Sequence, residues 1–197
     1  MRATFQALTD ALVPTTNEYG YPPFFNSGDR NVHEYVIYCL DHYTSVQQQL
    51  HHAIIPLAYP TAIMLDAAAI QLVNARQATP SGQSPFPVFF SCLSKIDRIR
   101  TLSALENLDI DLFLLPTPYQ NNAGLIKYVI DALNRFSLFG YYSEWPAYGS
   151  TRMFPPNNRR LEFFPLSWRE VGYPGVSFGY RDFRGFLLTM AEARDEK

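Results

Sequence analysis

The chain has 197 residues, of which 47% are hydrophobic, 15% aromatic and 17% charged, and its formal net charge is -2. This length suits one core, so we expect residues 1–197 to form a single helical domain. An average soluble domain carries about 25% charged residues. The shortage of charge therefore predicts an apolar face that is permanently covered. The nearly neutral balance gives no electrostatic reason to expect nucleic acid or an anionic membrane as a partner.

The sequence also predicts no membrane span. A membrane helix needs about 18 or more apolar residues, and the nearest run, residues 62–73, is interrupted by Asp66 and Gln71. No basic and apolar signal segment opens the chain. We therefore expect a cytoplasmic protein, with export alongside a partner that carries the signal as the alternative.

Two cysteines, Cys39 and Cys92, are too few for a disulfide scaffold and are not spaced as a Cys-x-x-Cys metal or haem site. Cys39 falls on the apolar stripe of a predicted helix, where a free cysteine usually acts as a small buried hydrophobe. The sequence leaves a bridge between the two open, although free cysteines are the expectation.

The first half of the chain predicts helices joined by irregular segments. Residues 5–14 form a short amphipathic segment that runs into proline, and residues 13–27 read as an irregular arm. Residues 31–34 fit a capping box, in which Asn31 and Glu34 each satisfy a free amide. The helix that follows carries one apolar stripe with helical spacing. Its members are Val32, Val36, Cys39, Tyr43, Val46 and Leu50.

The second half predicts three more helical regions. One runs from Pro60 to about Arg76, and residues 79–87 form a linker rich in Pro, Ser and Gly. Another begins near Val88 and continues through Leu105. Residues 116–118 break the pattern, and a new apolar stripe then leads into Gly140. Residues 149–181 have no convincing period, so we expect a long ordered loop with one short helical turn near Trp168. The predicted fold is mainly α, with long proline-, glycine- and aromatic-rich loops, especially in the C-terminal third.

Candidate catalytic and metal-binding groups do not form a known pattern. His33, His42, His51 and His52 share one predicted helix with Glu34 and Asp41. Their spacing includes no His-x3-His or Glu-x2-His pair, so solvated or capping histidines are favoured over a metal site. Asp109 and Asp111 are interpreted as residues that start or flank a short helical segment. No Gly-x-Gly-x-x-Gly follows a strand, and Ser143 is not in a nucleophile elbow. We therefore predict no catalytic, cofactor-binding or metal-ligating residue in this chain.

An aromatic block punctuated by glycines is the most informative part of the sequence. It comprises Phe139-Gly-Tyr-Tyr-Ser-Glu-Trp-Pro-Ala-Tyr-Gly149 and, further on, Trp168-Arg-Glu-Val-Gly-Tyr-Pro-Gly175. Glycine permits backbone angles that other residues resist, while Trp and Tyr offer flat, half-polar contact surface. Such a block fits either a loop layer over the chain's own core or a recognition surface for another molecule.

These motifs resemble the gluconate 2-dehydrogenase subunit 3 family. The family pattern has a helix ending in Gly-Tyr/Phe-Tyr/Phe-Ser, then Tyr-Gly, then Trp followed by Gly-Tyr-Pro-Gly. The matching residues here are 140–143, 148–149, Trp168 and 172–175. The opening segment, residues 5–14, also looks like the family's first helix. The chain departs from the pattern in residues 150–167, where the family usually has a short turn, and in starting without the family's frequent twin-arginine signal.

The resemblance implies a non-catalytic small subunit. In the family, such a subunit clamps a large FAD-dependent oxidoreductase of the glucose-methanol-choline type, which oxidises a sugar, sugar acid, glycoside or other alcohol. The FAD belongs to that partner, and electrons leave through a cytochrome c or another acceptor. The small chain supports folding, flavin loading or export of the large one.

The block then supplies candidate anchors for the partner. They are Tyr141, Tyr142, Trp145, Tyr148, Trp168, Tyr173 and Tyr180, with Arg184 as a charged contact. The alternative is that Trp168 and Tyr173 only hold the loop on the chain's own helices. A free-standing carbohydrate-binding protein is a second hypothesis, because exposed Trp and Tyr stack on sugar rings. A helical enzyme with a loop-built site is a third, and it lacks the expected residue patterns.

Overall fold

The computed structural model describes residues 1–13, 31–44, 46–48, 53–80 and 89–173. The described chain is mainly α-helical, as the sequence predicts. The helices are α1 Arg2–Leu12, α2 Val32–His42, α3 Ala58–Asn74, α4 Lys95–Asn107, α5 Ala123–Tyr142 and α6 Leu166–Glu170. The strands β1 Val46–Gln48 and β2 Ala53–Ile55 form one antiparallel hairpin, in which Val46 pairs with Ile55.

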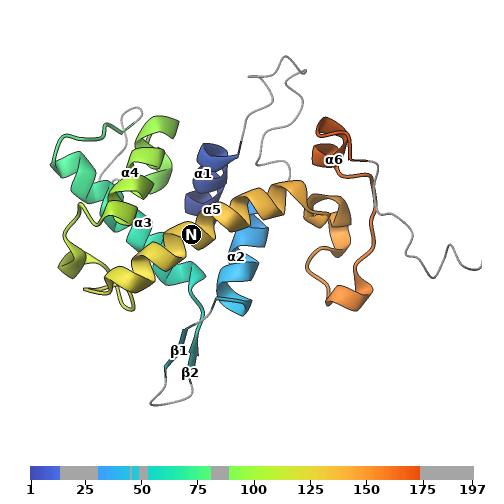
Figure 1. The fold of residues 1–197 in the computed structure, drawn as a ribbon, viewed down its shortest axis with the longest axis horizontal. Helices are drawn as coiled ribbons and strands as arrows, with labels where there is room; N and C mark the ends of the chain where they lie inside the picture. Colours follow the sequence, from blue (N-terminus) through green and yellow to red (C-terminus); the bar gives the residue numbers. More distant parts are fainter. Residues whose placement is uncertain (14–30, 45, 49–52, 81–88, 174–197) are drawn as a thin grey trace, which may run out of the picture.

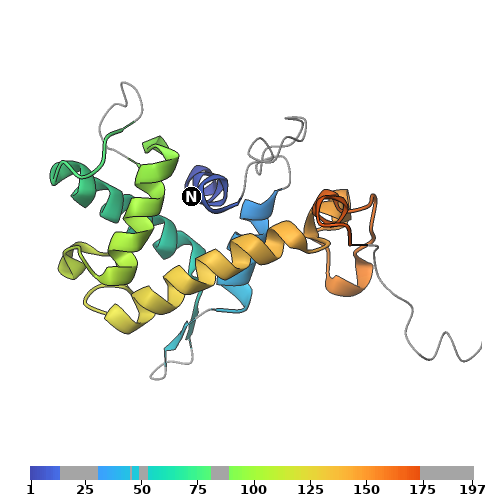
Figure 2. The ribbon, with the colours of Figure 1, turned by 45° about the horizontal axis from the view of Figure 1, so that its top comes forward.

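Helix α5 is the longest element and connects the two ends of the molecule (Figure 1). Its first half packs against α4, and α1 and α2 lie along its middle and second half. Helix α3 packs against α4 at one end, while α6 lies beyond the C-terminal end of α5 (Figure 2). The β1–β2 hairpin projects from the edge of the helical body. This arrangement leaves the end of α5 with few helical neighbours.

One hydrophobic core holds α1 to α5 together. Helix α1 contributes Phe5 and Leu8, which are fully buried between the other helices. Alanines 62, 68 and 69 of α3 are also buried, and their small side chains permit close helix packing. Tyr119 is fully buried as well, and its hydroxyl bonds to that of Thr61 over 2.6 Å. Burial raises the pKa of Tyr119 to about 12, so this phenol stays neutral and keeps its hydrogen bond.

Helix α2 is shorter than its apolar stripe predicts. The stripe extends to Leu50, but α2 ends at His42 and β1 follows at Val46. The hydroxyl of Thr44 donates to the carbonyls of Cys39 and Leu40, which takes up acceptors of the last turn and stops the helix. Leu50, like His51 and His52, lies outside the described residues. The helical interpretation of residues 43–50 is therefore wrong for the part that is described.

The capping box predicted at residues 31–34 is also wrong, although α2 does begin where it places the helix. Asn31 has a left-handed backbone (φ 51°) and its side chain caps no amide. When its amide oxygen faces Arg152, it accepts from that guanidinium at 2.7 and 2.9 Å. Glu34 pairs with Arg2 at 3.2 Å and with Arg152 at 3.3 Å. Long-range ion pairs therefore take the polar groups that local capping would have used.

The third helical region also starts later than the sequence predicts. Phe90–Cys92 form a 3-10 turn, and α4 begins after Ser94, whose hydroxyl accepts from the amide of Asp97 at 3.2 Å. Ile96 is 71% exposed on α4, whereas Leu105 is fully buried. Within α4, therefore, the later apolar residues Leu102 and Leu105 lie in the core, whereas Ile96 and Ile99 are exposed.

Gly140 lets α5 approach α2 closely. A Cβ at this position would lie 2.8 Å from Cδ1 of Tyr35 and 3.1 Å from Cγ1 of Val32, so a neighbouring side chain or helix would have to move. The same helix has a second glycine, Gly124, with nothing within 4 Å of the position that a Cβ would take.

We predict that Gly140→Ala destabilises the protein, because overpacking costs about 1–3 kcal/mol. That exceeds the gain of about 0.5–1 kcal/mol from replacing a helical glycine. Gly124→Ala is the control and should be neutral or stabilising. Urea unfolding of both variants and the wild type checks this. Equal stability of Gly140→Ala and wild type would show that the helices tolerate the methyl group.

Candidate interaction surface

Residues 143–173 form a separate layer at the C-terminal end of α5, which we call the C-terminal module (Figure 1). It contains a 3-10 helix over Trp145–Thr151, a second over Pro156–Asn158, and α6. The sequence predicts here a long ordered loop with one helical turn near Trp168, and α6 is that turn. The two 3-10 helices give the segment more regular structure than its sequence pattern indicates.

Trp145 attaches the module to α2. Its side chain is 2% exposed, and its indole Nε1 donates to the carbonyl of Asn31 at 3.2 Å. The ring lies 5.3 Å from that of Tyr35 and 5.8 Å from that of Tyr38. Trp145 therefore belongs to the interior of this chain, where it joins two segments more than one hundred residues apart in sequence.

Arg159 stacks on the same aromatic cluster. Its guanidinium carbon lies 5.3 Å from the centre of the Tyr38 ring and 5.2 Å from that of Trp145. Its Nε donates to the carbonyl of Phe154 at 2.9 Å, which holds the loop below it. The sequence analysis does not single out Arg159 for this role. No local signal marks this role, because both rings come from distant segments.

Trp168 attaches α6 to the end of α5. The indole is 7% exposed and donates from Nε1 to the carbonyl of Tyr142 at 2.8 Å. The rings of Phe164 and Tyr173 pack edge-on against it, with centroids 5.6 and 4.8 Å away. The amide of Tyr173 also donates to the carbonyl of Trp168 at 2.8 Å. This indole therefore organises three aromatic neighbours at the molecular surface.

Gly149 and Glu162 close the loop that contains the second 3-10 helix. The Glu162 carboxylate accepts from the amide of Ser150 at 3.1 Å and also from its hydroxyl. These bonds lower the pKa of Glu162. Gly149 has φ 50°, and a Cβ there would clash with the Glu162 carboxylate. The Tyr-Gly step in the sequence therefore has a structural reason: only glycine fits both the backbone angle and the carboxylate.

The predicted anchor residues fall into buried and exposed groups. Tyr141, Trp145 and Trp168 are buried within the chain, Tyr148 is half-buried, and Tyr142 and Tyr173 are exposed. Tyr148 donates its hydroxyl to Glu144 at 3.0 Å. Tyr180 and Arg184 lie outside the described residues. The exposed members and the surface that the buried ones position are the groups available to a partner.

Large exposed hydrophobic side chains gather on this part of the protein. Within the described ranges, twenty are at least 36% exposed, and ten of these fall between residues 138 and 173. That stretch makes up only a quarter of the described residues. The ten are Leu138, Phe139, Tyr142, Met153, Phe154, Leu161, Phe163, Phe164, Val171 and Tyr173. An enrichment of this size on a well-anchored layer is typical of an interaction surface.

A shallow apolar groove lies beside the module. Leu138, Phe139, Tyr142 and Ser143 line it, and its volume is about 280 Å³. The first three residues belong to the last turns of α5, and their side chains are exposed. The groove offers space and apolar surface without a charged group among its lining residues.

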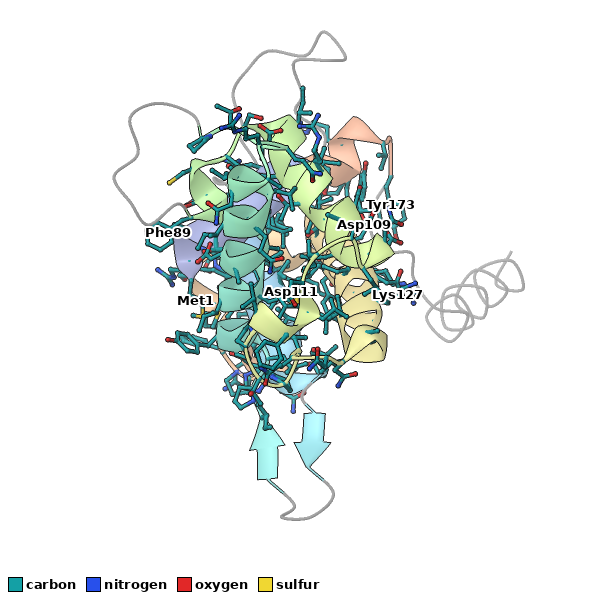
Figure 3. The ribbon with its side chains drawn as sticks, turned by 90° about the vertical axis from the view of Figure 1, so that its left-hand side faces the viewer. Met1, Phe89, Asp109, Asp111, Lys127 and Tyr173 are labelled. Carbon is teal, nitrogen blue, oxygen red and sulfur yellow. The ribbon has the colours of Figure 1, made fainter. Side chains whose placement is uncertain are left out.

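A second hollow, of about 270 Å³, lies between the end of α3 and the segment that precedes α5. Asp109 and Asp111 are among the residues that line it, and both are labelled in Figure 3. The Gln71 amide bonds to both the amide and the carbonyl of Asp111, at 2.7 and 3.1 Å. Asp111 also caps a 3-10 turn by accepting from the amide of Phe113 at 2.9 Å. The contact with Gln71 and the cap are both structural roles. They agree with the prediction that Asp111 lies at the boundary of a short helical segment.

Titratable groups near the module are not arranged as nucleophiles or bases. Burial raises the pKa of the Cys39 thiol and of the Tyr35 phenol, which keeps both neutral. Cys39 and Cys92 are not joined in a disulfide. Over the described part of the chain, no three His, Cys, Asp or Glu side chains lie close enough to hold a metal ion.

His33 is buried, at 6% exposed, where the sequence favours a solvated or capping histidine. The expectation of a solvated side chain is therefore wrong for His33, which lies in the first turn of α2, a helix that packs against α1. Burial lowers the pKa of His33 from the ordinary value of 6.5, and the nearby charge of Glu34 opposes the effect. Arg2 and Arg152 lower it further.

Comparison with models of known families, with curated proteins and with solved structures gave no match for this chain. Among the described helices, none is long and apolar enough to cross a bilayer.

We predict that Gly149→Ala loosens the C-terminal module. The left-handed backbone alone costs about 1–2 kcal/mol for a residue with a Cβ, and the methyl group also displaces Glu162. Gly172→Ala is the matched control, because Gly172 has φ 70° but nothing within 4 Å of the added atom. Urea unfolding followed by fluorescence reports on the module, which holds both tryptophans of the chain. A Gly172→Ala effect equal to that of Gly149→Ala would contradict the role of Glu162.

We predict that His33 makes the folded state less stable in mild acid. Because its folded pKa is depressed, the unfolded chain binds a proton more readily once the pH falls below 6.5. Stability should therefore be full above about pH 7.5 and decline as the pH falls through 6.5 toward the lowered pKa of the folded state. Urea midpoints of wild type and His33→Gln across this range measure the effect. An unchanged slope in His33→Gln would assign the pH dependence to other groups.

Proposed function

We propose that this chain is a non-catalytic small subunit that binds and stabilises a large FAD-dependent oxidoreductase of the glucose-methanol-choline type. The partner would oxidise a sugar, sugar acid, glycoside or other alcohol at its flavin and pass electrons to a cytochrome c or another acceptor. The small chain would support folding and flavin loading of the large one.

The observation that carries this proposal is the concentration of exposed large hydrophobic side chains on residues 138–173. A protein that worked alone would normally disperse such residues or cover them. Here Met153, Phe154, Leu161, Phe163 and Phe164 are each 42–60% exposed within a stretch of twelve residues. Apolar and aromatic groups of this kind form the centres of stable interfaces between subunits.

The anchoring of the module supports a preformed surface. The module is fixed to the helices by Trp145 and Trp168, and its loop is closed by the contact between Gly149 and Glu162. Binding of a partner therefore does not have to order this segment first. Preorganisation lowers the entropic cost of association. Of these residues, Gly149 and Trp168 belong to the motifs that resemble the gluconate 2-dehydrogenase subunit 3 family, which supports a flavoprotein as the partner.

The absence of an activated group among the described residues fits a binding role. The buried thiol and phenols near the module have raised pKa values and remain protonated near neutral pH. Their environment therefore favours packing and hydrogen bonding over nucleophilic attack. Chemistry would be left to the partner and its flavin.

Co-expression with a neighbouring reading frame that encodes a large protein with Gly-x-Gly-x-x-Gly near its start tests the proposal. We expect a stable yellow complex, with the large chain insoluble or poor in flavin when it is expressed alone. A flavin spectrum of the affinity-purified material measures this. A colourless monomer that binds sugars would contradict the proposal and favour a carbohydrate-binding protein.

Substitution of the exposed face tests the same proposal at the level of residues. We predict that Phe154→Ser with Phe163→Ser reduces recovery of the flavoprotein at least about tenfold, because exposed aromatics act as interface anchors. Phe113→Ser with Leu114→Ser is the control, since these side chains are 64% and 60% exposed on the segment between α4 and α5. Equal recovery with both double variants would contradict the assignment of the face.

A further inference from the structure

His33 lies at the junction between α2 and the C-terminal module. Two of its near neighbours in the chain hold Arg152 of the module. Asn31, with its amide oxygen turned toward Arg152, accepts from that guanidinium at 2.7 and 2.9 Å, and Glu34 pairs with it at 3.3 Å. The indole of Trp145 donates to the carbonyl of Asn31 at 3.2 Å. A charge on His33 would therefore act at the point where the module is attached to the helix.

The surroundings of His33 suit a neutral ring. The residue is 6% exposed, and within the described part of the chain its Nδ1 atom is buried without a hydrogen-bond partner. A protonated imidazole donates from both ring nitrogens, so protonation would place a charged N–H group at Nδ1 with no acceptor. A buried charge without a partner is costly, and burial accordingly lowers the pKa of His33. Acid therefore favours any arrangement that opens this site to water.

The charged groups around His33 are balanced before it takes up a proton. Among the described residues, those that act on it are Glu34 on its own helix, Arg2 and Asp10 on α1, and Arg152 of the module. None of this set comes from α3 or α5, although both helices pack against α2. Both arginines bind the same carboxylate, that of Glu34. A protonated His33 would add a third cation beside this single carboxylate.

Arg152 is the contact that gives way, because of where the two arginines lie. The side chain of Arg2 is 74% exposed, so it can turn into water without moving α1, whereas that of Arg152 is 19% exposed. Water screens the repulsion of a partly buried charge only weakly. Repulsion between His33 and Arg152 is therefore relieved by a movement of the loop that carries Arg152.

We propose that His33 is an acid sensor: when its ring takes up a proton, α2 loses its hold on Arg152 and the Trp145 end of the C-terminal module separates from α2. The separation opens the protonated ring to water, which accepts from its second N–H group. The other end of the module stays attached, because Trp168 donates to the carbonyl of Tyr142 at the end of α5. This inference concerns the chain's own fold and does not depend on the proposed function.

Exchange of the two indole hydrogens with solvent tests the proposal on the full chain, labelled with nitrogen-15 tryptophan and followed by NMR. Both tryptophans lie in the module, and Trp168→Phe assigns their signals. The ratio of the Trp145 rate to the Trp168 rate reports local opening, since the chemical exchange rate cancels. From about pH 7.5 to about pH 5.5 we expect this ratio to rise about three- to tenfold. The upper value holds if the opened His33 regains its ordinary pKa of 6.5.

Three variants assign the response to residues. His33→Gln should abolish the rise, because glutamine does not titrate. His42→Gln is the matched control, since His42 is exposed in the last turn of the same helix with its ring 4.4 Å from that of Tyr38. Its replacement should leave the rise intact. Arg152→Ala should raise the ratio already at about pH 7.5 and reduce the further rise in acid, because the module then lacks the contact on which His33 acts.

Several results would overturn the proposal. A constant ratio in the wild type, whether neither indole or both exchange faster in acid, would show that acid does not act on this end of the module. A rise that persists in His33→Gln, or that disappears in His42→Gln, would place the sensor elsewhere. An undiminished rise in Arg152→Ala would exclude the junction with Arg152 as the route. Circular dichroism at both pH values and urea unfolding of each variant provide the control for fold.

Discussion

The C-terminal module depends on the packing of Trp145 against the start of α2. The indole donates to the carbonyl of Asn31 and contacts the rings of Tyr35 and Tyr38, while Arg159 stacks on the rings of Tyr38 and Trp145. Asn31 and Glu34 complete the junction by facing Arg152. A chain segment of some thirty residues with little regular structure is thereby held at the end of α5, where it exposes apolar side chains without unfolding.

Two glycines make this arrangement sterically possible. At Gly140 the missing side chain brings α5 against Tyr35 and Val32, so the end of α5 reaches the aromatic cluster. At Gly149 the backbone turns with a positive φ and leaves room for the Glu162 carboxylate. The glycines of the aromatic block thus serve packing and turn geometry, and the aromatic residues between them divide into buried supports and exposed contacts. This division allows a sequence with few charged residues to fold around a core and still expose apolar side chains at one end.

Features that depend on local pattern could be predicted from the sequence. The mainly α fold, α3, α5 and the short turn at α6 follow from helical spacing, proline breaks and glycine stops. The start of α2 was predictable, but its end was not, because Thr44 competes for the last carbonyls and the hairpin replaces the expected continuation. The stacking of Arg159 and the burial of His33 also escaped prediction. Both depend on which distant segments pack together, and no short motif records that information.

The central claim is that residues 143–173 contact a large flavoprotein partner. Hydrogen exchange of the chain, alone and in the co-expressed complex, tests it most directly, because a buried interface slows exchange of the amides that it covers. The account predicts added protection of amides between residues 150 and 165, with little change in α3 and α4. Protection confined to α3 and α4, or an exchange pattern that is the same in both samples, would contradict it.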